Sequence, residues 1–92
     1  MKATIEVSRT GEAFHVTVRE GASATQHVVR ASADALQSLA PGVAPERAIE
    51  AAFRFLLDRE PKEAILASFA IGVISRYFPE FEAELGRYLP AR

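Results

Sequence analysis

Prolines divide the second half of the chain into short segments and so limit what this half can fold into. Pro61 and Pro79 interrupt a helical pattern of apolar residues that runs from Ile49 to Leu89, and Pro45 lies just before this pattern. Proline lacks a backbone N–H and is accepted without cost only in the first turn of a helix, so each of these prolines predicts the start of a new helix. The second half is therefore expected to be a set of short helices whose apolar stripes form a core.

The boundaries of these helices follow from caps and breaks. Ser32 is expected to cap a helix over residues 33–40, because its hydroxyl can accept a hydrogen bond from a first-turn amide. The main helix is expected over residues 45–60, a further helix over residues 61–69, and a last helical stretch over residues 73–89. The apolar side chains that these helices are expected to bury are Leu36, Leu39, Ile49, Ala52, Phe53, Leu56, Leu57, Ile65, Leu66, Phe69, Tyr77, Phe78, Phe81, Leu85 and Tyr88.

The first part of the chain alternates between apolar and polar residues, which is the pattern of half-buried strands. Strands are expected over residues 2–8, 13–19 and 25–31, joined by glycine-containing turns. A hairpin that closes Ser8 against Ala13 places the large apolar side chains of the first two strands on one face.

The third strand is expected to extend the same sheet. A hairpin that pairs Arg19 with Thr25 places Val28 on the apolar face. The same register places Thr25, His27 and Val29 on the open, polar face.

Strands followed by helices predict an α+β fold with segregated layers. We expect a three-stranded antiparallel β-meander followed by three to four short α-helices packed on one face. One domain over residues 1–92 is expected, with the meander in residues 1–31 and the helical half in residues 32–92.

Composition and charge narrow the function classes. The chain has 92 residues, no cysteine and a formal net charge of −1. Balanced charge argues against a nucleic-acid partner, because phosphate binding usually needs a basic surplus. The absence of cysteine suits a reducing compartment, so a cytoplasmic location is expected. No apolar run approaches the roughly 20 residues of a membrane span, so no membrane association is expected.

Five side chains on the expected open face form the candidate binding site: Glu6, His15, Thr17, Arg19 and His27. Two imidazoles and a carboxylate can ligate a metal ion or transfer protons, and an arginine can contact phosphate. The alternative interpretation is that an exposed sheet face is simply polar, since threonine and charged residues are common there. No phosphate loop, nucleophile elbow or metalloprotease motif occurs, so no catalytic residue and no cofactor are expected.

A second surface is expected on the main helix. Ala48, Ala51 and Phe55 lie off the buried stripe, so we expect Phe55 to be partly exposed in a shallow apolar strip. A helix from a second copy of the chain could pack on such a strip.

The phrases FRFLLDREPKEAIL, from Phe53, and ISRYFPEFE, from Ile74, resemble a C-terminal pattern, FLL-RE-PKE-IL followed by I-RYFPE-E, of small uncharacterised bacterial proteins. The resemblance is best over residues 53–82. It implies a small bacterial domain without an established activity, so it assigns no functional residue.

These observations lead to two hypotheses on function. The first is a non-enzymatic bacterial accessory or protein-interaction domain, which could bind another protein or itself. The alternative is the binding of a small molecule, a metal or a nucleic acid on the open sheet face around Glu6, His15 and His27.

Overall fold

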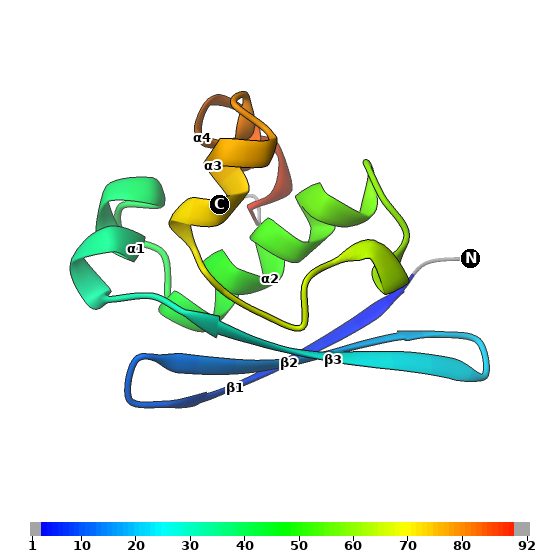
Figure 1. The fold of residues 1–92 in the computed structure, drawn as a ribbon. Helices are drawn as coiled ribbons and strands as arrows, with labels where there is room; N and C mark the ends of the chain where they lie inside the picture. Colours follow the sequence, from blue (N-terminus) through cyan, green and yellow to red (C-terminus); the bar gives the residue numbers. More distant parts are fainter. Residues whose placement is uncertain (1–2, 90–92) are drawn as a thin grey trace.

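The fold is α+β, with a four-stranded mixed sheet and helices on one face of it (Figure 1). It is seen in a computed structural model that describes residues 3–89. The strands lie in the order β1 (Thr4–Thr10), β2 (Ala13–Glu20), β3 (Ser23–Arg30) and β4 (Ser68–Ala70). The helices are α1 (Ala33–Leu39), α2 (Pro45–Leu57), α3 (Gly72–Tyr77) and α4 (Phe81–Glu84), with single 3-10 turns η1 (Lys62–Ala64) and η2 (Leu85–Tyr88).

The first hairpin has the expected faces but a different register. Thr10, rather than Ser8, is paired with Ala13, and the loop has two residues. Gly11 adopts a φ of 62°, which glycine reaches without the steric cost that a side chain would bring. The shift is two residues, so Val7 and Val16 still lie on the same face.

The register of the second hairpin differs from the expected one by a single residue, and this difference reverses the faces of β3. Glu20 is paired with Ser23 across another two-residue loop, in which Gly21 has a φ of 60°. Because side chains alternate along a strand, the slip turns His27 and Val29 toward the core and Val28 away from it. The prediction that His27 lies on the open face is wrong.

The fourth strand replaces the helix predicted over residues 61–69. β4 runs parallel to β3, and the hydrogen bonds from Val28 N to Ala67 O and from Ile71 N to Arg30 O flank the pairing, at 2.8 and 2.9 Å. The edge of β3 that faces away from β2 presents backbone groups that need partners, and this distant segment supplies them. A three-residue apolar pattern is too weak to predict a helix against such long-range pairing.

The first two helices begin as predicted. Ser32 Oγ accepts a hydrogen bond of 3.1 Å from Ala35 N, and Pro45 lies in the first turn of α2. The apolar strip predicted on α2 is not a surface, however, because Ala48, Ala51 and Phe55 are all buried.

The C-terminal elements cover this second face of α2. The Phe55 ring lies edge-on to three other rings, those of Phe78, Phe81 and Tyr88, with centroids 5.9, 5.0 and 5.8 Å away. The helix α2 is therefore central, with the sheet on one side and the segment from α3 to η2 on the other (Figure 1).

Candidate functional site

The predicted sheet-face site is only partly assembled. Glu6 and Arg19 are exposed and form an ion pair of 3.7 Å, and Thr17 lies opposite Glu6 in the register. His15 is exposed on the same face, whereas His27 lies on the other side of the sheet. Residues 3–89 contain no group of three or more His, Cys, Asp or Glu side chains that could hold a metal ion.

His27 is a buried structural residue with an exposed fraction of 3%. Its Nδ1 lies 2.8 Å from the carbonyl oxygen of Leu66, and its Nε2 lies 2.8 Å from Thr25 Oγ1. A carbonyl oxygen can only accept, so Nδ1 donates to Leu66, while Nε2 shares a hydrogen bond with the threonine hydroxyl, a group that can donate or accept. The ring also packs on Phe53, with centroids 5.4 Å apart. His27 thus fixes the chain at Leu66 to the sheet.

Lys62 fixes the same segment at its other end. Its side chain is only 5% exposed, and its Nζ lies 2.7 Å from Glu63 and 3.4 Å from Glu20. The hydrogen bond to Glu63 raises the pKa of Lys62, so the amine stays charged despite burial. The segment between α2 and β4 is therefore held in place at Lys62 and at Leu66.

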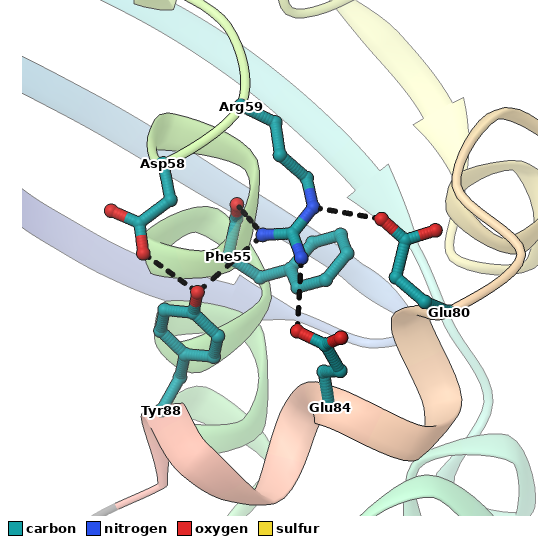
Figure 2. Close-up of polar contacts among 6 residues, drawn as sticks. All are labelled: Phe55, Asp58, Arg59, Glu80, Glu84 and Tyr88. Atoms are coloured by element: carbon teal, nitrogen blue, oxygen red, sulfur yellow. Dashed lines mark hydrogen bonds and ion pairs between the residues drawn. The ribbon is translucent and has the colours of Figure 1, made fainter.

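A network of charged residues joins the end of α2 to the C-terminal turn, and Figure 2 shows it around the guanidinium of Arg59. We call this the Arg59 cluster; its members are Phe55, Asp58, Arg59, Glu80, Glu84 and Tyr88. Arg59 Nε donates to Glu80 at 3.0 Å, and Nη2 donates to Glu84 at 3.0 Å. Arg59 Nη1 donates to the carbonyl oxygen of Phe55 at 3.2 Å and lies 3.4 Å from the Tyr88 hydroxyl.

The Arg59 cluster is satisfied within itself. The guanidinium carbon lies 3.7 Å from the centroid of the Phe55 ring, and the Tyr88 hydroxyl donates to Asp58 at 2.6 Å. The hydrogen bond to Tyr88 raises the pKa of Arg59. The pKa of Glu80 is lowered by its own backbone amide and by Arg59. Each of the three guanidinium nitrogens of Arg59 has a partner within the fold. The cluster is therefore best explained as a clamp that holds the C-terminal turn on α2.

An apolar groove lies on another side of the same helix end. It has a volume of about 280 Å³ and is formed by the end of α2, the segment from η1 to β4, and α3. Its lining residues are Leu56, Glu60, Ala64, Ile65, Leu66, Phe69, Val73, Ile74, Tyr77 and Phe78. We call the hollow that these residues line the groove.

The rim of the groove carries the two most exposed large apolar side chains of residues 3–89. Leu66 is 47% exposed and Tyr77 is 69% exposed, and both line the groove. Both were expected to be core residues, and their exposure contradicts that expectation. Apolar surface that gathers at one hollow is more informative than the same surface scattered over a protein.

Glu60 is the one acidic residue that lines the groove. Its side chain is partly buried among apolar groups, and burial raises the pKa of its carboxyl group. Within the described part of the chain, its carboxylate has neither a hydrogen-bond partner nor an ion pair. The neighbouring residue Arg59, in contrast, has two carboxylate partners.

Local geometry explains how Glu60 comes to lie there. The helix α2 ends at Leu57, and the amides of Arg59 and Glu60 both donate to Leu56 O at 2.9 Å. Pro61 follows with an extended backbone, which turns the chain away toward η1. The two consecutive residues at this turn therefore have different surroundings, with Arg59 in the cluster and Glu60 among the residues that line the groove.

Comparison with known proteins yields no relative: the chain matches no protein-family model, no curated protein and no solved structure. The resemblance to small bacterial proteins therefore stays a prediction. None of the helices in residues 3–89 has the length and apolar character needed to cross a membrane.

Proposed function

We propose that this protein is a non-enzymatic protein-interaction domain that binds a segment of a partner protein in the groove. The observation that carries the proposal is the position of Leu66 and Tyr77. These two side chains are the large apolar residues that the fold leaves most exposed, and both lie on the rim of one hollow. Leaving apolar area in water costs about 25 cal/mol per Å², so its concentration at one place favours a covered state.

The size of the groove favours a protein segment over a small molecule. Its volume of about 280 Å³ is at the lower limit for small-molecule pockets, which span about 300–1,000 Å³. The apolar surface also continues out of the hollow onto Tyr77, where a small ligand would leave it uncovered. A helix or extended peptide would fill the hollow with one or two anchor side chains and cover the rim with the rest.

The rigid walls support the same proposal. The segment that carries Leu66 is held by His27 and Lys62, as described above, and its opposite wall is the helix α3. A groove with fixed walls loses little conformational freedom on binding, which favours affinity.

The test is a selection of peptides from a random display library on the immobilised protein. The affinity of the selected peptides is then measured by fluorescence anisotropy. We expect Leu66→Ser and Tyr77→Ser to weaken binding by about tenfold or more, which is about 1.4 kcal/mol each. The matched controls are His15→Ser and Arg19→Ala, which lie on the other face of the sheet and should leave the affinity unchanged.

The reverse pattern would contradict the proposal. Binding lost in Arg19→Ala or His15→Ser, but kept in Tyr77→Ser, would transfer the site to the sheet face. The groove could instead be filled by a second copy of the chain, and sedimentation of the protein alone tests this. A concentration-dependent dimer that Tyr77→Ser dissociates would show that a second copy fills the groove.

A further inference from the structure

We propose that the segment bound in the groove carries a lysine or arginine side chain, and that the charged group of this side chain pairs with the Glu60 carboxylate. This inference rests on the proposed function and specifies the chemistry of the partner. It concerns selectivity, whereas Leu66 and Tyr77 account for binding as such.

The position of Glu60 carries the inference. Glu60 lines a hollow whose other lining residues are apolar or aromatic, and its side chain is partly buried. In residues 3–89 the carboxylate has no cation and no donor, although Arg59 is next in sequence. Arg59 cannot turn to Glu60 without leaving Glu80 and Glu84, so the chain offers Glu60 no cation from that side.

Covering the groove changes the electrostatic energy of the Glu60 carboxylate. A carboxylate that is partly removed from water and left unpaired is unfavourable, and the groove loses more water when an apolar segment covers it. A neutral or acidic partner would leave that charge uncompensated in the covered state. A cation from the partner would compensate it, and the low local dielectric would strengthen the pair.

The shape of the site favours a long basic side chain over a free ion. Lysine and arginine combine an apolar stem with a charged end, so the stem can lie along apolar walls while the charge reaches the carboxylate. Tyr77 adds an aromatic ring to the same groove, and the face of such a ring attracts cations. The expected partner is therefore an amphipathic segment with apolar anchors and one basic residue beside them.

Three matched probes separate the charge from the apolar contact: 2-phenylethylammonium, 2-phenylethanol and 3-phenylpropionate. They share a similar apolar body and differ in the charge of the polar end. Their affinities are measured at neutral pH and low salt from amide chemical shifts in NMR titrations. We expect the ammonium compound to bind about three to ten times more tightly than the alcohol, and the carboxylate to bind most weakly.

Variants of Glu60 then show whether this carboxylate is responsible. Glu60→Gln should make the ammonium compound and the alcohol bind equally, with the affinity of the alcohol unchanged. Glu60→Lys should reverse the order, so that 3-phenylpropionate binds most tightly. The matched control is Glu46→Gln, which removes the same charge from an exposed position at the start of α2 and should leave the order unchanged.

The outcomes distinguish the two proposals. Equal binding of all three probes to the wild-type protein would overturn the inference about the cation and leave the groove as a binding site. A preference for the ammonium compound that Glu60→Gln retains would also overturn it. If none of the probes shifts the amides of the groove, the inference about the cation fails, and the peptide selection described above decides the proposed function separately.

Discussion

Arg59 and Glu60 are neighbours in sequence and opposites in environment. Arg59 lies over an aromatic ring and pairs with two carboxylates, so its charge is fully used within the fold (Figure 2). Glu60 lies in an apolar groove with no cation from residues 3–89, and burial raises the pKa of its carboxyl group. The same helix end thus carries one charge that is paired within the fold and one that has no ion pair within residues 3–89.

We infer that the difference separates residues that stabilise the fold from residues that bind the proposed partner. Paired groups stabilise the fold, and their removal is expected to lower the free energy of unfolding. An unpaired, partly buried group is unfavourable for the isolated fold, and such groups persist where a ligand compensates them. The Arg59 cluster is therefore expected to control stability, and the groove is expected to control binding.

The largest effect is expected from two aromatic residues of similar size. Phe55→Ala should lower the free energy of unfolding by about 3–5 kcal/mol, because the ring is fully buried between α2 and the C-terminal turn. Tyr77→Ala, on the rim of the groove, should lower it by only about 0.5 kcal/mol. Urea denaturation measures both. Equal losses would mean that the rim of the groove belongs to the core.

The two histidines give the next contrast. His27→Ala should cost about 1–3 kcal/mol, because a buried ring and its hydrogen bond to the carbonyl of Leu66 are lost. It should also weaken peptide binding, since Leu66 would no longer be held. His15→Ala should stay within about 0.5 kcal/mol of the wild type in urea denaturation. A harmless His27→Ala would show that the buried hydrogen bonds do not fix the wall of the groove.

A third comparison keeps the charge and changes its geometry. Arg59→Lys should lower the midpoint of thermal unfolding, because an ammonium group cannot bind two carboxylates and a carbonyl while it stacks on Phe55. The loss should be smaller than that of Phe55→Ala. Arg76→Lys, at an exposed position of α3, is the control and should leave the midpoint unchanged. Equal midpoints for the two variants would argue against a clamp.

The sequence was sufficient to predict features that depend on neighbouring residues. The α+β class, the cap at Ser32 and the start of α2 at Pro45 follow from local patterns, and the structure confirms them. The predicted register of the second hairpin was wrong because Val28 and Val29 are both apolar. Either one can face the core, so the alternation does not decide between registers that differ by one residue.

Features that depend on distant contacts could not be predicted from such patterns. The strand β4 exists because β3 has a free edge, and Phe55 is buried because the C-terminal turn covers it. The groove was missed for the same reason. Leu66 and Tyr77 have the helical spacing of core residues, and only the final arrangement leaves them uncovered.

The central claim is that Glu80 is paired within the fold whereas Glu60 is not. A change from carboxylate to amide tests this claim most directly, since it should have opposite effects at the two positions. The pKa of Glu80 is lowered by its own backbone amide and by Arg59, so its ionised form stabilises the fold above the ordinary value of 4.5, and this stability is lost as the pH falls through its folded pKa. The pKa of Glu60 is raised by burial, so its protonated form is favoured in the fold, and this stability is lost as the pH rises through its folded pKa.

The measurement is urea denaturation of Glu60→Gln and Glu80→Gln at pH 7 and again well below pH 4.5. At pH 7 we expect Glu60→Gln to be more stable than the wild type, by about 0.5 kcal/mol, and Glu80→Gln to be less stable. Both differences should shrink at the lower pH, where the carboxyl groups become protonated. A loss of stability in both variants at pH 7 would contradict the account, because it would mean that Glu60, like Glu80, is already paired within the fold.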